Sequence, residues 1–201
     1  MPSRLLMFLL VCVCCRSFGT ENPRPAAGVL EVELNVSKCA LHFTLGAVLH
    51  TVQGTFKVKS GTIRYDLSSG QASGQVAVDV RSGETGDAAR DRQMHEAVLE
   101  SDRFPDAVFT LDHVTGRFAL DTESQVRIHG LLRIHGAEHG MTIPATVKVQ
   151  NNIASATARF PIPYVDWGMK DPSNFLLRVD KIVDVQVQLN GSLVTPSGTS
   201  R

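Results

Sequence analysis

The sequence predicts an all-β domain in which short antiparallel strands form either a two-sheet sandwich or a closed barrel. Three observations lead to this prediction. Apolar and polar side chains alternate with a period of two along most of the chain after Gly28. Turn-forming residues divide the alternating segments at short intervals, and a single stretch has the pattern of a helix. Each strand then has one apolar face, and these faces must be buried against one another.

The first 19 residues are typical of a secretory signal peptide. Residues 5–15 form a continuous apolar run of 11 residues between two arginines, which is shorter than the roughly 20 residues that span a bilayer. We therefore predict a signal peptide over 1–19, a linker over 20–27 and an exported protein, periplasmic or secreted, with no transmembrane segment in the mature chain. A membrane anchor and a lipid-modified cysteine are the alternatives.

The composition limits the classes of partner. The 201 residues include 20 Lys and Arg and 20 Asp and Glu, so the formal net charge is zero. Such a chain lacks the basic patch that nucleic acid requires. Its length is sufficient for a core that needs no disulfide or metal, and Cys39 is the one cysteine outside the N-terminal apolar run. We expect no nucleic-acid partner and a buried, unpaired Cys39 thiol.

The first half of the domain contains four alternating segments. Residues 30–36 alternate apolar with acidic or amide side chains, and residues 39–45 continue with the same period. Residues 63–67 and 76–80 alternate again, and the turn sequence 68–70 follows the first of them. This pattern predicts two opening strands followed by a hairpin.

Residues 88–100 are the one stretch patterned as a helix. Asp87 is a suitable N-cap, and Met94 and Val98 fall on one side of the helix. The charged residues within 87–95 predict an ion-pair network that anchors the helix to the strands. The helix is predicted as a connection between strands, not as a second domain.

The second half repeats the strand pattern at regular spacing. Its predicted strands and turns are the strands 114–120, 126–134, 141–149, 154–160 and 183–189 and the turns 121–124, 136–140 and 151–152. Together with the first half, eight or nine strands make up one domain over 28–193. A polar C-terminal tail covers 194–201.

Small side chains on the inner face bear on whether a barrel would be hollow. Ala154, Ala156 and Ala158 share one face of their strand, and Gly54 and Gly130 add two further small positions. An eight-stranded barrel has just enough interior for its own side chains or for one slender ligand. The small residues leave room for a ligand; the alternative is that they accommodate bulky neighbours in a filled barrel.

Residues along the whole domain occur in the same order and at the same spacing as the characteristic residues of a known family. They are Phe43, His50, residues 52–56, Gly61, Ile63, Arg90, Asp91, Phe104, Pro105, Phe109 and the strands 126–136 and 183–187. Over about 28–193 the chain resembles the YceI-like, polyisoprenoid-binding secreted proteins of bacteria. The segment 161–172 is longer and more aromatic than the family pattern, so the mouth of the pocket and the ligand can differ.

The resemblance implies a single closed antiparallel β-barrel of about eight strands, lipocalin-like, with one short helix in a connection. It also implies an apolar tunnel for a polyisoprenoid or another long-chain lipid, export to the periplasm, and binding without catalysis. A quinone-like lipid, bound by a partner of redox proteins, is a second hypothesis for the ligand.

Strand phase assigns the inner wall of the tunnel. The residues predicted to line it are Phe43, Phe56, Ile128, Leu132, Ala156 and Val185. His50 shares the phase of Val52, which makes it a candidate to hydrogen-bond a ligand head group; the alternative is a core histidine. Tyr164 and Trp167 are predicted at the mouth, with the alternative that they plug a dry barrel.

No catalytic or metal site is predicted. The sequence contains none of the G-x-S-x-G, H-E-x-x-H or G-x-x-x-x-G-K-[ST] motifs. His129 and His135 share the outer face of one strand but lie about 20 Å apart, too far to hold one ion. We expect no enzyme, no covalent cofactor and an apolar lipid, an isoprenoid or a quinone, as the partner. The alternative is a ligand-free or metal-binding periplasmic barrel that acts through protein partners, and a homodimer stays open.

Overall fold

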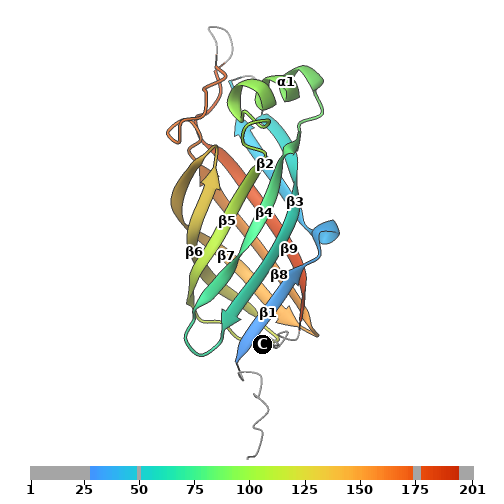
Figure 1. The fold of residues 1–201 in the computed structure, drawn as a ribbon, viewed down its shortest axis with the longest axis vertical. Coiled ribbons are helices and arrows are strands. Elements are labelled where there is room, and N and C mark those ends of the chain that lie inside the picture. The colour runs from blue at the N-terminus through green and yellow to red at the C-terminus, as the bar shows by residue number, and fades with distance from the viewer. Residues whose placement is uncertain (1–27, 49–50, 174–177, 195–201) are drawn as a thin grey trace, which may run out of the picture.

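The computed structural model describes residues 28–48, 51–173 and 178–194. Figure 1 shows these residues as a tall barrel of strands with a helix at one end. The strands are β1 (Val29–Leu34), β2 (Ala40–Gly46), β3 (Thr51–Asp66), β4 (Ala72–Glu84), β5 (Asp106–Gly116), β6 (Glu123–Ile134), β7 (Ala137–Gln150), β8 (Ile153–Ile162) and β9 (Val183–Leu193).

Several predictions from the sequence fall on other parts of the chain. The signal peptide (1–19), the linker (20–27), His50 and the tail beyond residue 194 lie outside the described residues. These four therefore stay predictions. No helix in the described ranges is long and apolar enough to cross a membrane.

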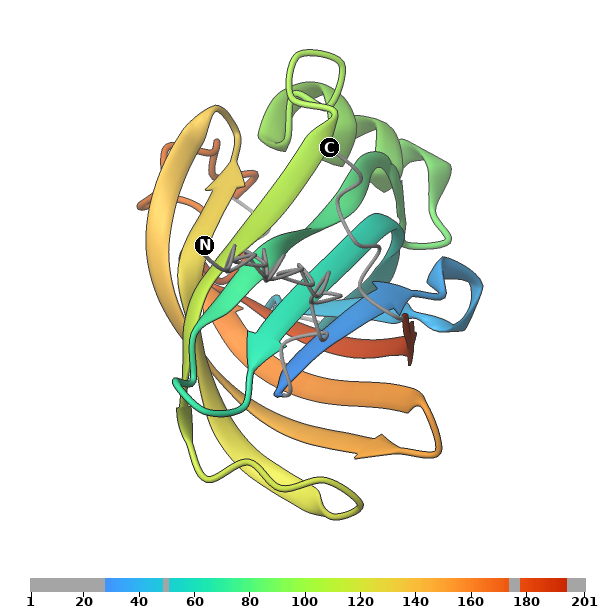
Figure 2. The same ribbon diagram turned by 60° about the horizontal axis from the view of Figure 1, so that its bottom comes forward.

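Eight of the strands close into a barrel. Around the sheet their order is β3-β2-β9-β8-β7-β6-β5-β4, and β4 pairs again with β3. Every pairing is antiparallel. Figure 2, in which the bottom of Figure 1 comes forward, shows the strands running round a closed ring. This confirms the closed antiparallel barrel and excludes the sandwich.

The ninth strand, β1, completes the wall beside the lower part of β3. It pairs with β3 at Val32↔Ile63 and with β9 at Val32↔Leu193. A 3-10 turn, η1 (Val36–Lys38), separates β1 from β2, so the two strands share one position between β3 and β9. Cys39 follows the turn and is half-buried, and the Asn190 N–H donates to its Sγ at 3.4 Å.

The helical connection follows β4. α1 (Ala88–Gln93) continues as a π-helical turn, η2 (Met94–Val98), which agrees with the predicted helix. The Asp87 carboxylate caps α1, because it accepts hydrogen bonds from the backbone N–H groups of Ala89 and Arg90, both at 3.0 Å. The bond from Arg90, and to a lesser extent that from Ala89, holds the pKa of Asp87 below its usual value.

Strand β5 is displaced along the chain from its predicted position. β5 covers residues 106–116 rather than 114–120, and residues 117–122 form the loop to β6. A bulge between Leu111 and His113 shifts the register of β5 against β6. The inward face of β5 therefore passes from odd to even residue numbers, which interrupts the period of two on which the prediction relied.

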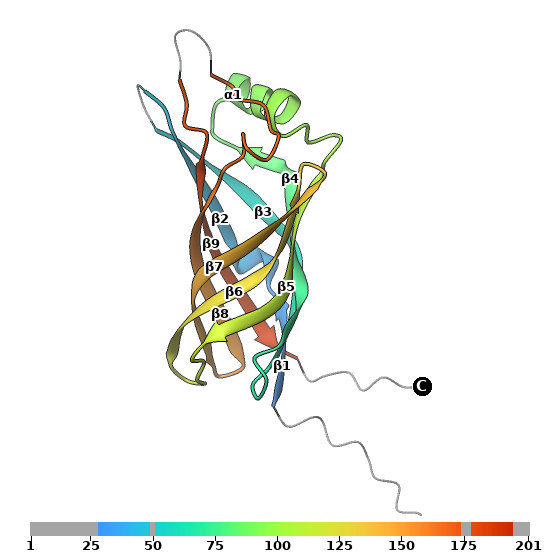
Figure 3. The same ribbon diagram turned by 90° about the vertical axis from the view of Figure 1, so that its left-hand side faces the viewer.

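The barrel has two distinct ends, which Figure 3 shows from the side. α1, the top of β2 and the segments 163–173 and 178–182 lie at one end, which we call the α1 end. The turns at 67–71, 117–122 and 151–152 lie at the other, which we call the opposite end.

Candidate ligand-binding site

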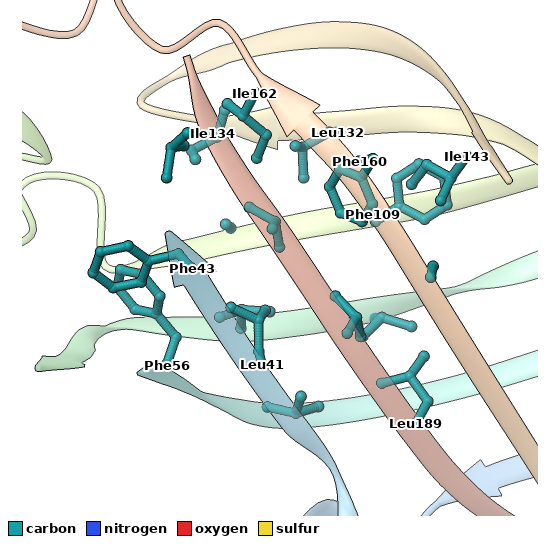
Figure 4. A pocket seen from close by; sticks show the side chains of 18 of the residues that line it. Leu41, Phe43, Phe56, Phe109, Leu132, Ile134, Ile143, Phe160, Ile162 and Leu189 are labelled. Carbon is teal, nitrogen blue, oxygen red and sulfur yellow. The ribbon is translucent and has the colours of Figure 1, made fainter. Parts of the chain in front are cut away.

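A long cavity occupies the interior of the barrel. Its volume is about 680 Å³, within the range of roughly 300–1,000 Å³ found for small-molecule sites. Side chains from all nine strands line it, together with residues of α1 and of the segments after β8. Figure 4 shows part of this wall, where labelled side chains such as Phe43, Leu132 and Leu189 come from different strands and border one space.

The interior is hollow and not filled by side chains. Among the described residues, no large side chain is less than 2% exposed. Even Met169 and Ala145 keep 3% and 4% of their surface accessible. A close-packed core buries many of its side chains completely, whereas the inward side chains of this barrel border a cavity. The structure therefore favours the hollow barrel over the filled one.

The small residues contribute unequally to the cavity. The three alanines of β8 that the sequence singled out, Ala154, Ala156 and Ala158, all line it. Gly54 and Gly130 do not enlarge it, because a Cβ at Gly54 would lie 2.4 Å from the Phe43 ring and a Cβ at Gly130 would lie 2.8 Å from the Phe109 ring. The expectation that these glycines leave room for a ligand is wrong, since neighbouring aromatic rings already fill the space.

Seven of the nine residues predicted to bind the ligand line the cavity: Phe43, Phe56, Ile128, Leu132, Ala156, Tyr164 and Val185. Trp167 is not among the lining residues. Its indole stacks on the His139 ring, with 3.9 Å between the ring centroids and 7° between the planes. His50, the ninth, lies outside the described residues. Contact between these residues and a ligand stays a prediction.

Sequence reasoning missed the part of the wall near the helix. Thr85, Asp87, Arg90, Gln93 and Met94 line the cavity at the α1 end. Strand phase cannot identify such residues, because the face that a connecting helix turns toward a barrel depends on how it docks. The sequence did show the N-cap and the charged residues of this helix, and these were the signals that could have pointed to polar residues at this end of the cavity.

Hydrogen bonds hold α1 at the end of β4. Arg90 donates from Nε to Thr85 Oγ1 at 2.8 Å and from Nη2 to the Thr85 carbonyl oxygen at 3.2 Å. The Asp91 carboxylate accepts from the Thr85 N–H at 2.8 Å. His95 Nε2 bonds to the Gly83 carbonyl oxygen at 2.8 Å. The predicted ion-pair network is wrong, because Thr85 and Gly83 supply neutral partners and the ion pairs of the described residues do not include α1.

An apolar cluster packs below the α1 end and joins η2 to three strands and to the segment 163–173. Its buried members are Val98, Leu132, Ile162, Tyr164, Met169 and Val185. Tyr164 is 5% exposed, and its hydroxyl donates to the Asp180 carbonyl oxygen at 2.9 Å. Burial, aided by the negative charges of Asp171 and Asp180, raises the pKa of Tyr164 to about 12.

We expect the Tyr164 phenol to stay protonated up to about pH 12. Because the fold favours the neutral form, the stability that this group contributes is complete below its ordinary pKa of 10 and is lost as the pH rises through 12. The measurement is an absorbance titration of tyrosinate, taken as the difference between wild type and Tyr164→Phe. A Tyr164 ionisation step near pH 10 would contradict the buried position.

Two aromatic pairs border the cavity at different heights. The Phe43 and Phe56 rings lie 5.3 Å apart in the part of the barrel nearer α1. The Tyr65 and Phe118 rings meet edge to face at the opposite end, with 5.2 Å between their centroids and 70° between their planes. Both pairs present carbon-rich surfaces to the cavity.

The histidines form no metal site in the part of the chain that the structure describes. No group of three or more His, Cys, Asp or Glu side chains there is placed to hold an ion. His129 stacks on His113 of β5 at 4.1 Å, and its two ring nitrogens bond to the hydroxyls of Thr115 and Thr142. His135 packs on an aromatic ring at the α1 end and is largely buried.

A model of the YceI-like domain matches residues 32–193. The chain belongs to the YceI-like family. The match runs from within β1 to the end of β9, so it includes the whole barrel wall around the cavity. A search of curated proteins found no match.

Three solved structures share the fold of this YceI-like protein. BcnA of Burkholderia cenocepacia is 16% identical with a TM-score of 0.64, over 78% of this chain and 98% of that one. A polyisoprenoid binding domain from Saccharophagus degradans, implicated in plant cell wall breakdown, is 17% identical with a TM-score of 0.66, over 82% and 99%. The YceI protein of Campylobacter jejuni is 17% identical with a TM-score of 0.58, over 70% and 84%.

Proposed function

We propose that this YceI-like protein binds one long-chain apolar lipid, an isoprenoid or a quinone-like lipid, and carries or sequesters it outside the cytoplasm. The observation that carries the proposal is the hollow barrel. Its cavity is lined almost throughout by apolar side chains, and Asp87 and Arg90 are the only charged residues among the described lining residues. A single slender tail along the barrel axis suits this shape.

The burial of a tail supplies enough free energy for tight binding. Each methylene removed from water contributes about 0.8 kcal/mol. A tail that buries about ten methylenes therefore gains roughly 8 kcal/mol before the costs of association and of ordering the chain. Apolar contacts alone account for affinity, so the site needs no metal and no covalent bond to the ligand.

The lining residues favour binding over catalysis. The described residues that line the cavity include no histidine and no cysteine. Ser155 is the one serine of the wall, and its hydroxyl lies 3.5 Å from the Lys148 carbonyl oxygen, without a base beside it. The described wall therefore offers neither a histidine base nor a cysteine nucleophile.

Two further observations support the proposal. The structural neighbour from Saccharophagus degradans is described as a polyisoprenoid binding domain. The apolar run at residues 5–15 favours export, and export would bring a lipid carrier close to membranes. A mature N-terminus at Thr20, read by protein sequencing from the native host, is the result expected for cleavage of the signal peptide.

The first experiment is to identify lipid that copurifies with the protein. We expect an organic extract of the mature chain from its native host to contain one isoprenoid, quinone or other long-chain lipid in near-equimolar amount, by mass spectrometry against a buffer blank. An absorbance band from a quinone ring would separate a quinone from a colourless lipid. An empty extract, together with failure of the lipid-free protein to take up added geranylgeraniol, would contradict the proposal.

A further inference from the structure

The polar side chains of the cavity are gathered at one end, and we propose that the lipid lies with an acidic head group against Arg90. This inference rests on the proposed function, since it concerns how the same cavity holds its ligand. Apart from the two tyrosines, the polar lining residues are Thr85, Asp87, Arg90, Gln93 and Ser155. Four of these five come from one short stretch at the α1 end.

The Arg90 guanidinium is held in a fixed position on the cavity wall. Its Nε and Nη2 atoms donate to the side chain and the carbonyl oxygen of Thr85. The guanidinium has five N–H donors, and no hydrogen bond from Nη1 is formed with the described residues. Arg90 is half-buried and lines the cavity. A fixed, partly desolvated fork of donors is therefore available to a ligand.

The charge of Arg90 has no counter-ion in direct contact, although the Asp87 carboxylate lies near enough for the two charges to attract each other. No carboxylate oxygen of the described residues lies within 4.0 Å of its guanidinium nitrogens. The two nearest acidic residues in the sequence are engaged elsewhere: Asp87 accepts the N–H groups that begin α1, and Asp91 accepts from Thr85. A half-buried cation of this kind gains most from an anion that arrives with the ligand.

The remainder of the wall determines the direction of the tail. Beyond the stretch 85–93, no charged side chain borders the cavity in the described chain. The opposite end is bordered by the Tyr65–Phe118 pair and by aliphatic residues. An acidic head group has no cationic partner there, whereas an apolar tail fits it. The head group therefore lies at the α1 end and the tail points toward the opposite end.

Asp87 limits where an anion can sit. Its carboxylate also lines the cavity and stays ionised, since its hydrogen bonds to the helix lower its pKa. Asp87 is exposed, however, so water and salt screen its charge more than that of half-buried Arg90. A carboxylate or phosphate on the inner side of α1 pairs with Arg90, and the neutral amide of Gln93, one turn further along, provides additional donors.

The test compares lipids that differ in the head group alone. The lipid-free mature chain is loaded with Nile red, and the dye is displaced by geranylgeranyl monophosphate or geranylgeraniol, and by palmitate or hexadecanol. We expect at least one acid to bind about ten- to hundredfold more tightly than its matched alcohol. The phosphate pair and the carboxylate pair distinguish the two acidic classes, and a preference for either acid supports the inference.

Three variants assign the preference to Arg90. In Arg90→Gln the acid and its alcohol should bind within about twofold of each other, and thermal unfolding of the variant shows whether the barrel is intact. Arg90→Lys should keep part of the preference, because it keeps the charge and loses the fork. Arg92→Gln removes an exposed positive charge from the same helix and should keep all of it.

The outcomes separate this inference from the proposed function. Equal affinities of acid and alcohol in wild type, or an unchanged preference in Arg90→Gln, would overturn the head-group assignment and leave lipid binding in place. Failure of all four lipids to displace the dye from a folded barrel would overturn both.

Discussion

Ala156→Trp is expected to abolish lipid binding and to leave the barrel folded. Ala156 lies midway along β8, opposite Val147 of β7 and Leu189 of β9, and its side chain lines the cavity. An indole at this position occupies the space through which a tail would pass. The hollow interior can accept the added volume, which a close-packed core could not do without strain. We expect the affinity for geranylgeraniol to fall about tenfold or more and the copurifying lipid to disappear.

Thr157→Trp is the matched control for this substitution. Thr157 is the next residue of β8 and is exposed on the outer face, so the same indole added there should leave lipid binding unchanged. The thermal unfolding of both variants shows whether the barrel persists. If Ala156→Trp retained the wild-type affinity in a folded protein, the tail would not pass Ala156 and the position of the ligand in the cavity would be wrong.

The sequence was most informative where strand pairing is regular. β6, β7, β8 and β9 pair with one another without a register shift, and their alternation predicted both the strands and their inward residues. Ile128, Ala156 and Val185 were assigned to the cavity wall on this basis, and the structure places all three there.

Bulges account for what strand phase could not predict. The pairing of β3 with β4 shifts register between Thr55 and Lys57 and again between Val58 and Ser60. β3 therefore turns even-numbered residues inward in its first half and odd-numbered residues in its second, as Phe56 and Ile63 illustrate. A continuous strand of 16 residues consequently gave two separate patterns, one through Val52 and Phe56 and one from Ile63, and the sequence did not predict that they belong to one strand.

The positions of the side chains at the α1 end depend on tertiary contacts that cannot be read from the sequence. Arg90 reaches the cavity because Thr85 and Gly83 dock the helix across the end of β4. Trp167 leaves the cavity because the His139 ring stacks on it. Both outcomes are decided by partners distant in the sequence or by the docking of a helix, so neither local periodicity nor residue type predicts them.

Gly74→Ala is expected to be the most destabilising of the single-methyl substitutions in the barrel. Gly74 of β4 pairs with Ile63 of β3 and has a φ of +120°, which side chains other than glycine rarely adopt. A Cβ would lie 2.0 Å from the Thr62 carbonyl oxygen and 3.0 Å from the Ile63 Cα. Both are backbone atoms of the neighbouring strand, so relief of the overlap requires β3 and β4 to separate at the seam that closes the barrel.

The cost of that separation is about 4 kcal/mol or more in the free energy of unfolding, which lowers the melting temperature by roughly 8–16 °C in a domain of this size. Gly140→Ala is the matched control, because Gly140 of β7 has no atom within 4 Å of the added methyl group and no positive φ. It should change stability by less than about 1 kcal/mol. Equal melting temperatures for the two variants would contradict the close approach of β3 and β4. A loss of lipid affinity in Gly74→Ala at temperatures where the variant is still folded would show that the β3–β4 seam also shapes the cavity.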